Sequence, residues 1–203
     1  MMKYSDIDQQ KSAFVFELDN VIYPEKDYLF QVYYLFASFL EYTELVDAKL
    51  ITALMVDTYN TQGKDAVFDK VKEKFAIDEK YRINFQHLLL TVKLPLKLLV
   101  YQALLDMLQE IVVDRKKIFI VANDNPALQL NKIKQTEWHG LENYLFCYFA
   151  EEISPMPEPD VLHLLMKEHG LARRDVVMVG YSEAAANSAE ACGIDYYNIR
   201  EIL

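Results

Sequence analysis

Short apolar runs that end in polar loops alternate with helical segments along most of this chain, and this alternation constrains its fold more than any other feature. The runs are predicted to be buried strands, and they cover residues 13–18, 117–122, 145–149, 175–179 and 194–197. Strands joined by helices form parallel βαβ units with right-handed crossovers. The sequence therefore predicts an α/β fold with a doubly wound, Rossmann-like parallel sheet.

The stretch between the first two runs departs from this alternation. It consists of helical patterns without a strand signal as far as Leu90, and a strongly apolar helix is expected over residues 96–112. We expect an α/β core of residues 1–24 and 92–203, interrupted by an all-helical insertion, residues 25–91. Most aromatic residues of the insertion should pack between its helices, and the remainder should form a surface for a partner.

Charge and composition exclude several functional classes. With 31 acidic and 21 basic residues, the formal net charge is −10, which argues against a nucleic-acid partner or a membrane partner. The amino-terminal segment is polar, and no apolar run is long enough to span a bilayer, so a cytoplasmic location is expected. Cys147 and Cys192 lie in apolar stretches and are expected to be buried thiols.

Four loops follow the first four predicted strands. In an open parallel sheet, ligands bind beyond the carboxyl ends of the strands, so these loops should meet at one edge and form any functional site. The loops contain Glu17-Leu18-Asp19-Asn20, Ala122-Asn123-Asp124-Asn125, residues 154–159 and residues 180–183.

The loops resemble, in the same order, the four motifs of the haloacid dehalogenase superfamily of aspartate-nucleophile phosphatases and their relatives. The four similar segments are FVFELDNVIYP, IFIVANDNP, SPMPEPDVL and VMVGYSEAAANSAEACGID. Many members of the superfamily have a helical cap between the first two motifs, so the resemblance extends over nearly the whole chain. It implies a haloacid dehalogenase-like core with an inserted helical cap.

The resemblance gives seven positions a family role, although most of them carry a different residue type. They are Glu17 at the nucleophile, Asp19 at the general acid, Ala122 at the phosphoryl-binding hydroxyl, Asn123 beside it, Met156 at the lysine, and Tyr181 and Ala185 at two metal-binding aspartates. A nucleophile displaced by about 1 Å can cost roughly 10²-fold in rate, and each missing donor typically costs about 10²–10³-fold. Neither Tyr181 nor Ala185 is a good Mg²⁺ ligand.

The substitutions together predict a degenerate site without a cofactor. No cation is identified near the remaining acids, so the crevice should be less charged and should disfavour a phosphate dianion. The Tyr181 ring is expected to fill the former phosphate cavity, and Asp19-Asn20 to form a turn.

Three functions remain open at this point. The first is a pseudoenzyme that binds a small polar ligand in the crevice between core and cap, or a protein partner. The second is a weak hydrolase in which Glu17 is the nucleophile or metal ligand, Asp19 is the acid and base, and Mg²⁺ is bound. The third is a structural module that forms homo-oligomers through the cap.

Overall fold

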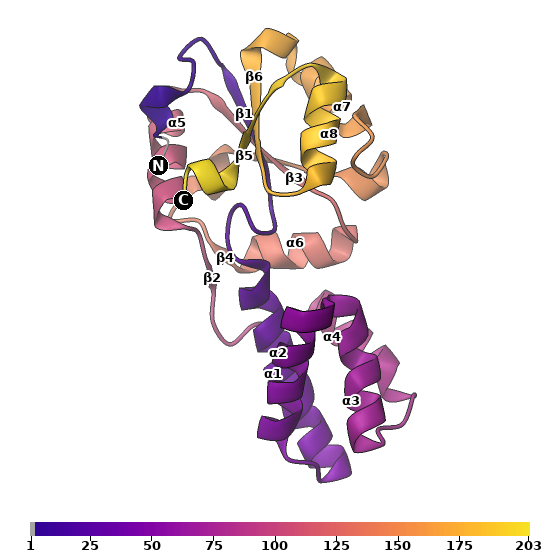
Figure 1. Ribbon diagram of the computed structural model, residues 1–203. Coiled ribbons are helices and arrows are strands. Elements are labelled where there is room, and N and C mark those ends of the chain that lie inside the picture. Colours follow the sequence, from indigo (N-terminus) through magenta and orange to yellow (C-terminus); the bar gives the residue numbers. More distant parts are fainter. Residues whose placement is uncertain (1–2) are drawn as a thin grey trace. The chain divides into compact units, whose positions relative to one another are not determined.

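A computed structural model describes residues 3–203, and its contacts divide the chain into two compact units (Figure 1). The core unit combines the segment up to Pro24 with Leu98–Leu203, and the helical unit is Glu25–Lys97. Within the described residues, no helix is long and apolar enough to cross a membrane.

The core unit is built on a five-stranded sheet in which all strands run parallel, in the order β5-β3-β1-β6-β7. The strands are β1 (Ala13–Glu17), β3 (Lys117–Ala122), β5 (Leu145–Phe149), β6 (Val176–Gly180) and β7 (Asp195–Asn198). Strand β1 is central, and its pairing places Phe16 beside Ile120 of β3 and Val179 of β6. The predicted α/β fold with a doubly wound parallel sheet is confirmed.

Helices α7 and α8 lie on one side of this sheet and α5 on the other (Figure 1). The helices of the core unit are α5 (Gln102–Val113), α6 (Pro126–Gln135), α7 (Asp160–His169) and α8 (Glu183–Cys192). Alternate strand residues, among them Val15, Val121 and Met178, pack with Leu165 of α7 and Ala189 of α8 in one buried cluster. Because β1, β3 and β6 are covered on both faces, their sequences are nearly continuous apolar runs.

Two short strands of the core unit are not predicted from the sequence. Strands β2 (Leu98–Leu99) and β4 (Thr136–Glu137) pair in parallel in a separate sheet. Helix α5 begins only at Gln102, so the prediction of a helix from residue 96 is wrong for its first six residues. The reason is that periodicity alone does not distinguish a short apolar strand from a buried helical segment.

The two cysteines have different environments. Cys192 is buried, as predicted, but Cys147 is exposed, which corrects the prediction that both thiols are buried. Cys147 belongs to β5, which is at the edge of the sheet and, among the strands of residues 3–203, pairs with β3 alone. An apolar sequence run therefore does not guarantee burial when the strand has a neighbour on one side only.

The helical unit contains four α-helices and, within its described residues, no strand. They are α1 (Glu25–Glu44), α2 (Ala48–Gln62), α3 (Val67–Phe75) and α4 (Tyr81–Thr91). Aromatic rings form much of its interior: the ring centroid of Phe36 lies 4.8 Å from that of Phe85 and 6.1 Å from that of Phe68. Other aromatic residues face solvent, such as Tyr42, which is 87% exposed.

Candidate active site

The first two candidate residues lie at the carboxyl end of the central strand. Glu17 is the last residue of β1, and Asp19 follows in a tight turn in which the Asn20 amide donates to the Tyr23 carbonyl over 2.9 Å. Asn20 has a φ of 62°, a left-handed conformation that Asn tolerates better than most residues. The turn brings the Tyr23 hydroxyl back to Asp19, where it donates to Oδ1 over 3.1 Å.

Both carboxylate oxygens of Glu17 accept hydrogen bonds from the turn between β6 and α8. Oε2 accepts from the backbone amides of Tyr181 and Ser182, at 2.6 and 3.0 Å. Oε1 accepts from the Ser182 hydroxyl at 2.6 Å, while the Ser182 oxygen accepts from the Ala185 amide and thus caps α8. Glu17 is buried, with 8% of the residue exposed, and its side chain joins the end of β1 to the turn that follows β6.

Gly180 and Tyr196 complete the surroundings of Glu17. A Cβ atom at Gly180 would lie 2.9 Å from Glu17 Oε2 and 2.7 Å from the Tyr196 ring, so only glycine permits this approach. Burial, together with the charges of Glu17 and Glu201, raises the pKa of Tyr196 to about 12. Tyr196 is therefore a neutral neighbour that covers the Glu17 carboxylate.

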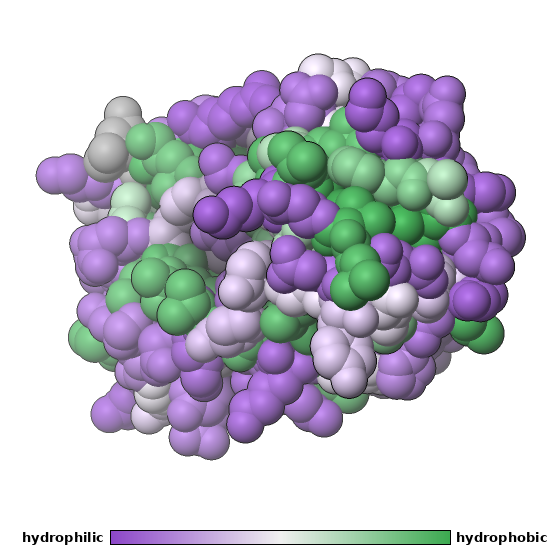
Figure 2. Space-filling model, turned by 90° about the horizontal axis from the view of Figure 1, so that it is seen from below, coloured by the Kyte–Doolittle hydropathy of each residue, from purple (hydrophilic) through white to green (hydrophobic). Residues whose placement is uncertain are grey.

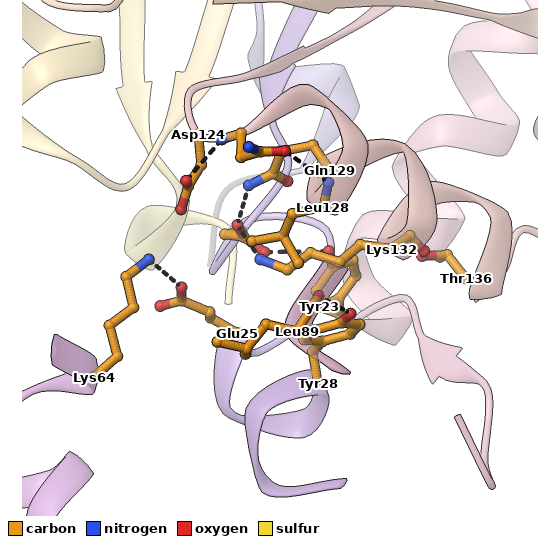
Figure 3. Close-up of polar contacts among 12 residues, drawn as sticks. Tyr23, Glu25, Tyr28, Lys64, Leu89, Asp124, Leu128, Gln129, Lys132 and Thr136 are labelled. Carbon is orange, nitrogen blue, oxygen red and sulfur yellow. Dashed lines mark hydrogen bonds and ion pairs between the residues drawn. The ribbon is translucent and has the colours of Figure 1, made fainter. Parts of the chain in front are cut away.

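Asp19 forms its strongest contacts with helix α6. Its Oδ2 accepts from Lys132 Nζ at 2.7 Å and from Gln129 Nε2 at 2.9 Å (Figure 3). The Lys132 side chain is 1% exposed and that of Asp19 is 20% exposed, so this is a largely buried ion pair with an added amide hydrogen bond. A buried cation needs such a partner because desolvation of an unpaired charge is costly.

Lys132 overturns the prediction that no cation lies near the remaining acids. Gln129 and Lys132 are three residues apart and therefore share one face of α6, and both are buried. In the sequence, Gln129 and Lys132 are recognisable only as two polar residues at helical spacing that follow the second motif. This signal is weak because the same spacing is common on solvated helix faces, and the family motif places the lysine elsewhere.

The positions of the second and third motifs are joined to each other. Asn123 donates through Nδ2 to the Met156 carbonyl at 3.3 Å, and its Oδ1 accepts from the Met156 amide at 2.7 Å. The Met156 side chain is 5% exposed and belongs to the buried cluster beneath α7 and α8, and Ala122 is buried at the end of β3. Asn123 therefore holds a loop in place, and Met156 is a core residue.

Tyr181 does not fill a cavity, contrary to expectation. It is 41% exposed, its hydroxyl accepts from Arg200 Nη2 at 3.2 Å, and the Arg200 guanidinium lies 5.0 Å from its ring centroid. Its backbone amide, rather than its ring, is directed at Glu17. Ala185, at the other former aspartate position, is fully buried. Among residues 3–203, no three His, Cys, Asp or Glu side chains gather as a metal site would require.

The candidate residues thus form three separate contacts. Glu17 binds the turn that contains Tyr181, Asp19 binds α6, and Asn123 binds the loop at Met156. Ser182, Gln129 and Lys132 are the partners that the sequence does not identify. The carboxylates of Glu17 and Asp19 and the side-chain amide of Asn123 are thus each hydrogen-bonded to another part of the chain.

Comparison with known proteins points to one family. The sequence model of the haloacid dehalogenase-like hydrolases matches residues 14–199. No curated protein sequence is significantly similar to the chain.

Solved structures share the fold at low sequence identity. A hydrolase from Streptococcus pneumoniae has a TM-score of 0.55 and 13% identity, covering 93% of this chain and 92% of its own. A proposed β-phosphoglucomutase from Thermotoga maritima has a TM-score of 0.62 and 15% identity, with coverages of 92% and 84%. The L-2-haloacid dehalogenase of Xanthobacter autotrophicus, with chloropropionic acid covalently bound, has a TM-score of 0.51 and 14% identity, with coverages of 92% and 76%.

Replacing Glu17 tests whether its carboxylate is structural. Glu17→Gln removes one of two acceptor oxygens that receive three hydrogen bonds, so we expect the free energy of unfolding to fall by about 2 kcal/mol. Urea denaturation measures this change. The matched control is Glu183→Gln, which removes an exposed carboxylate near the same turn and should change stability by less than about 0.5 kcal/mol. Unchanged or increased stability in Glu17→Gln would indicate a carboxylate retained for catalysis at a cost in stability.

Replacing Lys132 tests the buried ion pair. Lys132→Met leaves the Asp19 carboxylate without its cation, and we expect a loss of about 3 kcal/mol, the low end for a buried pair because Asp19 is partly exposed. The double variant Lys132→Met/Asp19→Asn should lose less than the sum of the single variants, by roughly 1 kcal/mol or more. Lys134→Met, at an exposed position of the same helix, is the control. Additive losses would show that the two charges do not depend on each other.

Proposed function

Because this chain belongs to the haloacid dehalogenase-like hydrolase family, we propose that it is a member that keeps the family fold but lacks efficient phosphatase activity, and that it acts by binding. The observation that carries the proposal is the position of Glu17. Both of its carboxylate oxygens are hydrogen-bonded to the turn at Tyr181 and Ser182.

A nucleophile needs an oxygen that can approach phosphorus. Productive attack requires the reacting atoms to be about 3–3.5 Å apart and aligned. Freeing Oε2 of Glu17 would break two hydrogen bonds and freeing Oε1 would break one, and each hydrogen bond to a charged acceptor is worth about 1.5–3 kcal/mol. Attack by Glu17 is therefore opposed by the local fold as well as by the extra methylene.

The groups that would stabilise a transferring phosphoryl are also missing. Ala122 has no hydroxyl, and the Met156 side chain packs in the core. Lys132 carries positive charge but is buried against Asp19. Without preorganised donors, a phosphoryl transition state gains little stabilisation.

The residues at the metal positions do not fit Mg²⁺. This ion requires near-octahedral oxygen ligation, commonly including one or two carboxylates. Glu17 already accepts three hydrogen bonds, Ala185 has no oxygen on its side chain, and the Tyr181 hydroxyl is bound to a guanidinium. The cation of Arg200 beside Tyr181 would also repel a divalent ion.

These features favour a binding role over a catalytic one. Polar groups at the edge of the sheet are bound to one another, which leaves few of them for a small polar ligand. We therefore favour recognition of a protein partner.

A second candidate is a weak hydrolase of the same family, and Lys132 is the observation that favours it. Its ammonium lies 2.7 Å from Asp19 and supplies a cation in place of the one absent at Met156. In this case Asp19 would be the acid and base, and Glu17 would have to leave its turn to act as the nucleophile.

A phosphatase assay separates the two candidates. We expect wild-type protein to hydrolyse p-nitrophenyl phosphate in the presence of Mg²⁺ no faster than Glu17→Gln and Asp19→Asn, because neither carboxylate is available. The control is Glu183→Gln, which makes the same change of charge on an exposed side chain. Turnover that is lost in both site variants, but kept in the control, would contradict the proposal and support the hydrolase. Turnover that is equal in all four proteins would come from a contaminating enzyme.

A further inference from the structure

Helix α2 has one face in the interior of the helical unit and an opposite face that is open. Ile51, Met55 and Thr58 form the buried face. The open face borders a surface hollow of about 600 Å³, which is lined by Tyr34, Ala48, Lys49, Thr52, Ala53, Val56, Asp57 and Asn60. The α2 residues of this set recur every three or four positions, so they form a continuous stripe along the helix.

The stripe combines small residues with exposed apolar side chains at its edge. Ala53 is exposed near its centre, and a methyl side chain allows another helix to approach closely. Tyr34 is 58% exposed and Leu50 is 60% exposed, and aromatic side chains are enriched at protein interfaces. Figure 2 shows one face of the molecule, on which apolar patches are set among hydrophilic side chains.

The charges of the stripe are self-complementary. Lys49 lies four residues before Ala53 and Asp57 lies four residues after it, so the two are separated by about 12 Å along the helix. Both are exposed, and neither forms an ion pair within residues 3–203. A two-fold axis at Ala53 would place Lys49 of each copy opposite Asp57 of the other, because residue i contacts j and j contacts i in an isologous interface.

We infer that the open face of α2 binds a second copy of this chain, as an antiparallel helix pair centred on Ala53. Two Lys49–Asp57 contacts would flank the centre, and the Tyr34 side chains would cover its edges. The antiparallel arrangement also places the positive end of each helix dipole near the negative end of the other. This inference goes beyond the proposed function, because it holds whether or not the core unit retains any hydrolysis.

Charge reversal tests the inference through its symmetry. Lys49→Glu and Asp57→Lys each replace two attractive contacts by two repulsive ones, and each should raise the dimer dissociation constant about tenfold or more. The double variant Lys49→Glu/Asp57→Lys restores opposite charges and should return the constant close to that of wild type. Sedimentation equilibrium over a range of protein concentrations measures all of them.

A mixture of the two single variants gives a second readout. In the mixed dimer, Glu at position 49 faces Lys at position 57, and Lys49 faces Asp57, so the mixture should associate more tightly than either variant alone. Lys74→Glu, which makes the same change of charge at an exposed position on α3, should leave the wild-type constant unchanged. Circular dichroism verifies that each variant is folded.

The dissociation constants of these proteins distinguish an α2 pair from other arrangements. Recovery in both the double variant and the mixture supports the α2 pair. A wild-type protein that remains monomeric at every concentration overturns the inference. So does a double variant that is as weak as the single variants, or a loss of association in Lys74→Glu of the same size as in Lys49→Glu.

Discussion

The hydrogen bonds between Glu17 and the turn at Tyr181-Ser182 are the interaction on which the arrangement of this site depends. They tie the central strand β1 to β6 and complete the cap of α8 through Ser182. A side chain one methylene longer than Asp reaches these amides, with Gly180 and Tyr196 packed around it. The extra methylene of Glu17, which would misplace a nucleophilic carboxylate, is thus suited to a structural role.

The negative charge of Asp19, the second carboxylate of the site, is balanced by Lys132. Met156 stands at the lysine position of the third motif. Without a cation from elsewhere, Asp19 would therefore be a partly buried, unpaired anion. Lys132 and Gln129 supply the compensating contacts from α6. Because removal of one partner leaves the other charge buried and uncompensated, we expect Asp19 and Lys132 to be energetically coupled.

The sequence predicts the sheet well because β1, β3 and β6 are buried on both faces and have continuous apolar runs. It predicts β2 and β4 poorly, since a strand of two residues depends on tertiary pairing rather than on a local pattern. The motif positions locate Glu17, Asp19 and Asn123 at the correct edge. Their partners are not predictable in the same way: the environments of Lys132 and Tyr181 depend on which helix face is buried and on the proximity of Arg200.

The Glu17 carboxylate is held by the amides of Tyr181 and Ser182. Amide hydrogen exchange measured by nuclear magnetic resonance reports on these two hydrogen bonds, with wild-type protein and Glu17→Gln compared in the absence and presence of Mg²⁺ and inorganic phosphate. We expect slow exchange at both amides in the wild type, unaffected by Mg²⁺ and phosphate, and faster exchange in the variant. Fast exchange in the wild type, or loss of protection when Mg²⁺ and phosphate are added, would contradict this expectation.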